Sequence, residues 1–203
     1  MAPSSIALAA AALVAAMSGT LDAALPSPSP LVSVRVADLT GRPISDVKAA
    51  LTEAGRLIAT AAVRVDWTIC DLADLSGPCS APMARGERVV RIVALPSGII
   101  SGRVRLGYAV LDATAQTGVL ATVYLDPIAK LTSEGPVDEA TLLGRAIAHE
   151  LGHLLLGSNA HSGGGLMRAV WTLDELRRNR QSDWTFSERQ AATIRRSASV
   201  SVK

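Results

Sequence analysis

The chain has 203 residues, enough for one well-buried core but too few for two ordinary domains. Hydrophobic residues make up 49% and charged residues 19%, which indicates a globular protein and excludes a disordered one. The formal charge is +2 and no basic run forms a stripe, so the composition points to neither nucleic acid nor an anionic membrane as a partner.

The N-terminal region has a composition of its own. Residues 6–17 form an alanine-rich apolar run that is too short to cross a bilayer, and small residues follow it. We expect a signal peptide over residues 1–24, a Pro/Ser-rich linker over 25–30 and a single folded domain over 31–203. The mature protein would then be secreted or periplasmic, without a membrane span. Because no Lys or Arg precedes the apolar run, a disordered alanine-rich tail is the alternative.

The folded region begins with alternating strand and helix patterns. Residues 31–37 alternate apolar and polar side chains, with β-branched residues on one face, and this predicts a strand. Apolar residues at helical spacing then predict an amphipathic helix over residues 44–60. Residues 63–69 return to a period of two and predict a second strand.

The chain has two cysteines, Cys70 and Cys79, nine positions apart with a Gly-Pro pair between them. We expect a disulfide closing this short loop, which agrees with export to an oxidising compartment. Two free buried thiols are the alternative. A zinc site is disfavoured, because the spacing is not Cys-x-x-Cys and no histidine is near in sequence.

Three further strands are expected in the middle of the chain. Residues 88–95 form an apolar run that is stopped by a Pro-Ser-Gly segment. Residues 106–111 indicate a short strand, and residues 119–125 a longer one that the following Asp-Pro pair should end. Residues 128–134 are expected to form a helical turn.

The C-terminal third is predicted to be helical. A long helix should begin at Pro136 and end at Gly157, and its broad apolar surface predicts that it is largely buried. Residues 171–178 indicate a short helix, and a final helix fits a capping box with Thr185 as N-cap and Glu188 at N3. The order of elements predicts an α+β fold in which one mixed sheet packs against the helices.

All three histidines of the chain lie within residues 149–161. His149, Glu150 and His153 form an H-E-x-x-H motif, and on a helix this places two imidazoles on one face. Zinc binds such nitrogens, leaves one position for water and lowers the pKa of that water, while Glu150 can accept its proton. The sequence therefore predicts one catalytic Zn²⁺. A helix that carries these residues without chemistry is the alternative, but unpaired His and Glu are costly to bury.

A third histidine and a methionine follow the motif. His161 lies after a glycine, and Met167 lies after a Gly-rich turn. This arrangement resembles the metzincin clan of zinc peptidases, including its matrixin-like members, whose signature is H-E-x-x-H-x-x-G-x-x-H followed by a methionine in a tight turn. Here one extra residue precedes the glycine and another precedes the third histidine, which gives H-E-x-x-H-x-x-x-G-x-x-x-H.

The resemblance implies a zincin-like α+β fold and a role for each residue of the motif. His149, His153 and His161 would bind the zinc ion, Glu150 would be the general base, and Met167 would lie beneath the metal. The substrate would be a peptide or protein, and in this clan an edge strand such as residues 121–125 pairs with it.

Several alternatives stay open from the sequence. Glu175, on the next predicted helix, would be the third ligand in a gluzincin-type site, although acids near a helix start are common. Met167 would fill the core equally well. The chain would otherwise be an exported zinc- or peptide-binding module without catalysis, or a structural secreted domain without metal.

Overall fold

The computed structural model describes residues 29–70, 77–94, 105–112, 114 and 117–200. The expected signal peptide and most of the expected linker lie outside these residues. Among the described residues, no helix is both long and apolar enough to cross a bilayer.

Strands and helices follow one another in an α+β order. The elements are β1 (Leu31–Asp38), α1 (Ile44–Ala59), β2 (Arg64–Cys70), η1 (Pro78–Ser80), β3 (Arg88–Val93), β4 (Gly107–Asp112), β5 (Thr117–Tyr124), α2 (Leu125–Glu134), α3 (Glu139–Leu156), α4 (Leu173–Arg178), η2 (Gln181–Trp184) and α5 (Glu188–Val200). The predicted strands and long helices are therefore present, with bounds that differ by at most three residues.

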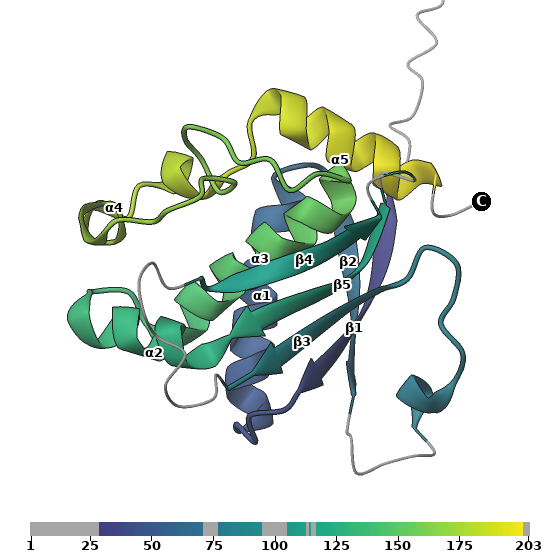
Figure 1. Cartoon of the computed structure of the whole chain (residues 1–203), viewed down its shortest axis with the longest axis horizontal. Coiled ribbons are helices and arrows are strands. Elements are labelled where there is room, and N and C mark those ends of the chain that lie inside the picture. Colours follow the sequence, from purple (N-terminus) through teal and green to yellow (C-terminus); the bar gives the residue numbers. More distant parts are fainter. Residues whose placement is uncertain (1–28, 71–76, 95–104, 113, 115–116, 201–203) are drawn as a thin grey trace, which may run out of the picture.

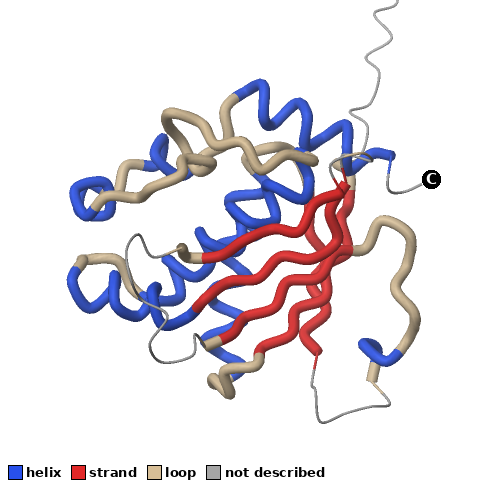
Figure 2. Tube along the Cα trace, viewed as in Figure 1, coloured by secondary structure: helices blue, strands red, loops and turns tan. Residues whose placement is uncertain are grey.

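The five strands form one mixed sheet in the order β2-β1-β3-β5-β4. β4 runs antiparallel to β5, whereas the other neighbours are parallel. Helices α1 and α3 lie side by side behind the sheet in Figures 1 and 2, so that the fold has two layers. This confirms the predicted α+β class with one mixed sheet packed on the long helix.

The core lies between the sheet and these two helices. Val32, Val34 and Val36 of β1 are almost fully buried, as their alternation predicts. Gly144 of α3 allows a close approach to α1, since a Cβ atom there would lie 2.5 Å from the carbonyl oxygen of Ala50. As a result, most of α3 is shielded from solvent.

The junction between β5 and α2 differs from the prediction. The Asp-Pro pair was expected to end the strand, yet α2 begins at Leu125 and contains Pro127 in its first turn. Proline is well tolerated there, because the first-turn N–H groups of a helix have no partner within the helix. The pair therefore starts a helix of ten residues instead of separating a strand from a single turn.

The helix starts are also corrected. Helix α3 begins at Glu139, and Asp138 is its N-cap. The final helix has its capping box at Ser187 and Gln190, not at Thr185 and Glu188: the Ser187 N–H donates to Gln190 Oε1 at 2.9 Å, and the Gln190 N–H donates to Ser187 Oγ at 3.3 Å. Both patterns fit the S/T-x-x-E/Q rule, and the Ser187 pattern lies directly before the first residue of α5.

The expected position of the edge strand is wrong. β5, which contains residues 121–124, lies between β3 and β4, and the sheet edge beside the long helix is β4. Apolar and polar alternation identifies a strand but not its neighbours, so the sequence could not show that β4 covers β5.

The predicted disulfide between Cys70 and Cys79 is present. It joins the end of β2 to η1, and Arg35 of β1 anchors the segment that follows by donating to the carbonyl oxygens of Cys79 at 3.1 Å and Ala81 at 2.7 Å. Arg35 also pairs with Glu87 at 2.6 Å, which ties this loop back to the start of β3.

Removing the disulfide should lower the stability of the domain. For a sequence separation of nine residues, the chain-entropy relation gives about 2.5 kcal/mol for the Cys70→Ser/Cys79→Ser variant. Urea unfolding measures this loss, and a reductant should bring the wild type to the midpoint of the variant. An unchanged midpoint on reduction would show that the bond does not constrain the unfolded chain.

Candidate metal centre

Helix α3 holds the motif in a fixed place. Its N-terminus is capped by Asp138, whose Oδ1 accepts the Thr141 N–H at 2.9 Å. At its C-terminus Gly157 adopts a left-handed conformation with φ of 62°, which glycine takes without a steric penalty. His149 and His153 are one turn apart on this helix and are 7% and 3% exposed, so they project from a rigid, buried element.

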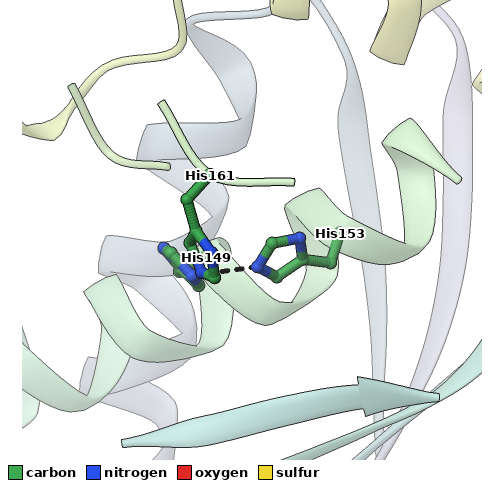
Figure 3. Close-up of side chains that lie close together, drawn as sticks. All are labelled: His149, His153 and His161. Carbon is green, nitrogen blue, oxygen red and sulfur yellow. Dashed lines mark hydrogen bonds between the residues drawn. The ribbon is translucent and has the colours of Figure 1, made fainter. Parts of the chain in front are cut away.

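The three histidines come together. His149 and His153 project from α3, and His161 comes from the loop beyond Gly157, so that the rings meet beside the helix (Figure 3). The Nε2 atoms of His149 and His153 are 3.1 Å apart. One nitrogen from each of the three rings lies within 4.8 Å of the others, a spacing able to hold a metal ion. Among the described residues this is the one such group of His, Cys, Asp or Glu.

Backbone carbonyls fix the tautomers of the two helical histidines. His149 Nδ1 lies 2.8 Å from the Leu166 carbonyl oxygen, and His153 Nδ1 lies 2.7 Å from that of Ser158. A carbonyl oxygen only accepts, so each Nδ1 carries the hydrogen and each Nε2 presents a lone pair. Burial lowers the pKa of His149 to about 3 and also lowers the pKa of His153, which keeps both rings neutral at pH 7.

This arrangement fits a divalent metal. Two Nε2 lone pairs 3.1 Å apart repel each other unless a cation lies between them. Tetrahedral zinc with nitrogen bonds of about 2.0–2.1 Å places neighbouring nitrogens about 3.3 Å apart. Neutral imidazoles with Nδ1–H bound to backbone oxygen are the form in which histidine binds zinc. The donor set therefore suits a metal such as zinc with three protein ligands.

The lengthened loop is an ordered turn that supports His153. The carbonyl oxygen of His153 accepts the N–H of Gly157, the cap residue, and that of Ser158 at 3.3 Å. Ser158 Oγ in turn accepts the Ala160 N–H at 3.1 Å. The carbonyl of Ser158 is thereby directed at the imidazole of His153. Sequence reasoning did not find Ser158 or Leu166, because a backbone carbonyl leaves no signature in the sequence.

Met167 ends a tight turn beneath α3. The Ser162 N–H donates to the Met167 carbonyl oxygen at 2.9 Å, which closes the turn. Met167 is fully buried, and a Cβ atom at Gly152 would lie 2.7 Å from its sulfur. The side chain thus packs against α3 at Gly152, the residue before His153. Its neighbour Leu166 supplies the carbonyl that orients His149.

Glu150 lies in a buried position beside the cluster. It is 6% exposed, and its Oε2 atom has no hydrogen-bond partner among the described residues. Burial raises the pKa of Glu150 to about 8, and Arg105 opposes part of this rise. An unpartnered carboxyl oxygen in a buried place is costly, and Glu150 lines the same cleft as the three histidines, so its position indicates a chemical role.

Glu175, the alternative third ligand, has other partners. It is the N3 residue of the capping box of α4, where Oε2 accepts the Thr172 N–H at 2.9 Å. Its Oε1 lies 3.3 Å from Nη1 of Arg168. Both oxygens are therefore occupied outside the histidine cluster, as the helix-start interpretation predicts.

A cleft of about 1090 Å³ opens over the cluster. It is lined by Glu150 and the three histidines, by Gly107 and Ala109 at the start of β4, by α2, and by residues 168–171. In Figure 1, α2 and α4 lie at the end of the molecule where β4 begins. The start of the edge strand therefore runs along the cleft past Glu150.

Aromatic and cationic side chains support the cleft wall. The Trp171 ring lies edge-on to His149 at 5.7 Å and to Trp184 at 5.3 Å between centroids. The guanidinium carbons of Arg145 and Arg168 lie 3.9 Å and 5.2 Å from the Trp184 ring centre. These contacts tie α3, the methionine turn and the cleft wall together. These contacts could not be predicted from the sequence, because they join residues far apart in the chain.

Comparisons with known proteins identify the fold. No family model and no curated protein matches the sequence. An archaemetzincin from Methanopyrus kandleri has 18% identity over 86% of this chain and 99% of its own length, with a TM-score of 0.53. A zinc-dependent peptidase from Methanocorpusculum labreanum has 15% identity over 79% of this chain and 99% of its own, with a TM-score of 0.50. The chain has the fold of these metallopeptidases.

The geometry predicts one zinc ion per chain. Zinc should bind the purified protein at a stoichiometry of one and raise its melting temperature, since a ligand at 100 times its Kd adds about 2.7 kcal/mol to the stability. His161→Ala should lose this thermal shift and still fold, because His161 is exposed. An unchanged zinc-induced shift in His161→Ala would remove this residue from the ligand set.

Proposed function

We propose that the protein is a zinc-dependent peptidase that hydrolyses peptide bonds at the three-histidine site. The observation that carries the proposal is the unpartnered Oε2 of Glu150 in the cleft that His149, His153 and His161 also line. The similar folds of an archaemetzincin and a zinc-dependent peptidase support it.

Each residue of the site has a defined task. His149, His153 and His161 would hold the zinc ion, and the carbonyls of Leu166 and Ser158 keep the first two rings in the correct tautomer. When bound, zinc polarises the scissile carbonyl and lowers the pKa of a water molecule. A bound cation would also lower the raised pKa of Glu150, so that its carboxylate can accept the proton of the attacking water and donate it to the leaving amine.

The cleft supports an extended peptide as the substrate. Among the described residues β4 is the edge strand of the sheet, and its first half, from Gly107 to Ala109, lines the cleft. An extended chain can pair with such an edge by ordinary strand addition. We therefore propose that β4, and not residues 121–125, pairs with the substrate.

We also propose that the protein is exported. The apolar run over residues 6–17 and the Pro/Ser-rich segment after it support this location. The disulfide between Cys70 and Cys79 agrees with an oxidising compartment.

Replacing the proposed base should abolish hydrolysis and leave metal binding intact. Glu150→Gln keeps the shape of the side chain and removes its basicity, and general-base catalysis contributes about 10²- to 10⁴-fold. The variant should bind one zinc ion and cleave denatured casein more slowly by that factor. Glu134→Gln, at the exposed rim of the same cleft, is the matched control and should keep the wild-type rate.

Two results would contradict the proposal. Undiminished turnover by Glu150→Gln would exclude Glu150 as the base. If the wild-type protein binds zinc but cleaves no peptide, it would instead be an exported zinc- or peptide-binding module.

A further inference from the structure

Gly107, the first residue of the edge strand β4, lies against Glu150. A Cβ atom at position 107 would be 2.8 Å from Cγ and 2.9 Å from Oε1 of Glu150, and 2.6 Å from the carbonyl oxygen of Thr122. Such distances are shorter than real carbon contacts allow. The side chain of Glu150 therefore occupies space that any other residue at position 107 would need.

The backbone does not explain the glycine. Gly107 is not among the glycines with positive φ, which are Gly41, Gly86, Gly157 and Gly165 in the described part of the chain. An alanine could adopt the backbone conformation of Gly107 without strain. Position 107 therefore requires glycine because a larger side chain would clash with its neighbours, and not because of its backbone conformation.

The inward side chains of β4 become larger away from Glu150. Alternate residues of a strand point to the same face, so Gly107, Ala109 and Leu111 all face α3. Leu111 contacts the region of Leu154, because a Cβ atom at Gly118 would meet both side chains. The strand thus fills its interface with α3 at one end and leaves it open at the other, where Glu150 lies.

We propose that Gly107 is a positioning residue, which leaves the space in which the Glu150 carboxylate lies between the edge strand and α3. The inference rests on the proposed peptidase function for its catalytic consequence. Gly107 and its strand confine the Glu150 side chain on one side while α3 fixes its backbone, and Glu150 lines the same cleft as the three histidines.

A methyl group at position 107 should therefore displace the carboxylate. Gly107→Ala should bind one zinc ion and keep its KM for a short peptide within about threefold, whereas kcat should fall by about 100-fold, the usual effect of misplacing a catalytic group by 1 Å. In a Glu150→Asp background, the carboxylate is one methylene shorter, so that adding Gly107→Ala should lower kcat much less.

The contact can also be measured without activity. In zinc-free protein, Gly107→Ala should lower the melting temperature by several degrees, and part of this loss should disappear when Glu150→Ala is added, because the two side chains no longer compete for space. Gly118→Ala is the matched control. It introduces a similar clash on β5, with Leu111 Cδ2 and with Leu154 Cδ2 at 2.6 Å, at the end of β4 away from Glu150. It should therefore lower the melting temperature additively with Glu150→Ala and leave kcat unchanged.

The outcomes separate this inference from the proposed function. An active wild type with no coupling between positions 107 and 150, in kcat or in melting temperature, would overturn the inference alone. An inactive wild type that still shows the thermal coupling would overturn the peptidase function and keep the steric contact. If Gly107→Ala does not fold but Gly107→Ala/Glu150→Ala does, the inference is supported. If neither variant folds, the clash with the Thr122 carbonyl oxygen, and not Glu150, sets the requirement for glycine, which contradicts the inference.

Discussion

Two hydrogen bonds from imidazole to backbone determine whether the histidines of the buried helix α3 can bind a metal ion. The Nδ1–H groups of His149 and His153 donate to the carbonyls of Leu166 and Ser158, so the opposite nitrogens present lone pairs 3.1 Å apart. Without a cation these lone pairs repel each other in a place that solvent hardly reaches. The segments that supply the carbonyls both follow α3, which makes the site a joint product of the helix and the chain that folds back beneath it.

The return of the chain beneath α3 depends on packing that is not local in sequence. Met167 fills the space under Gly152, and Trp184 holds the cleft wall through two arginines and Trp171. These contacts leave little freedom for the loop that carries Leu166. On the other side of the helix, β4 limits the room around Glu150. The turn that contains Met167, the cleft wall at Trp184 and strand β4 thus surround α3 and limit the movement of its histidines and of Glu150.

Much of the fold could be predicted from periodicity, and the rest required pairing information. The alternation in β1 and the burial of α3 follow directly from the apolar pattern. The position of β4 at the edge could not be deduced, since strand alternation does not reveal a neighbour. The Asp-Pro pair in the first turn of α2 misled the prediction, because proline both ends strands and begins helices. At the site, the spacing of the histidines predicted the metal cluster. The carbonyl groups of Leu166 and Ser158, and the lack of a side chain at Gly107, could not be predicted, because such contacts follow no sequence pattern.

The central claim is that three imidazoles share one divalent ion. X-ray absorption at the zinc edge tests it most directly on the full chain loaded with one equivalent of zinc. The account predicts three imidazole nitrogens at about 2.0–2.1 Å and one further light atom, with one imidazole fewer in His161→Ala. A wild-type spectrum that fits only two imidazoles, or that is unchanged in His161→Ala, would contradict it.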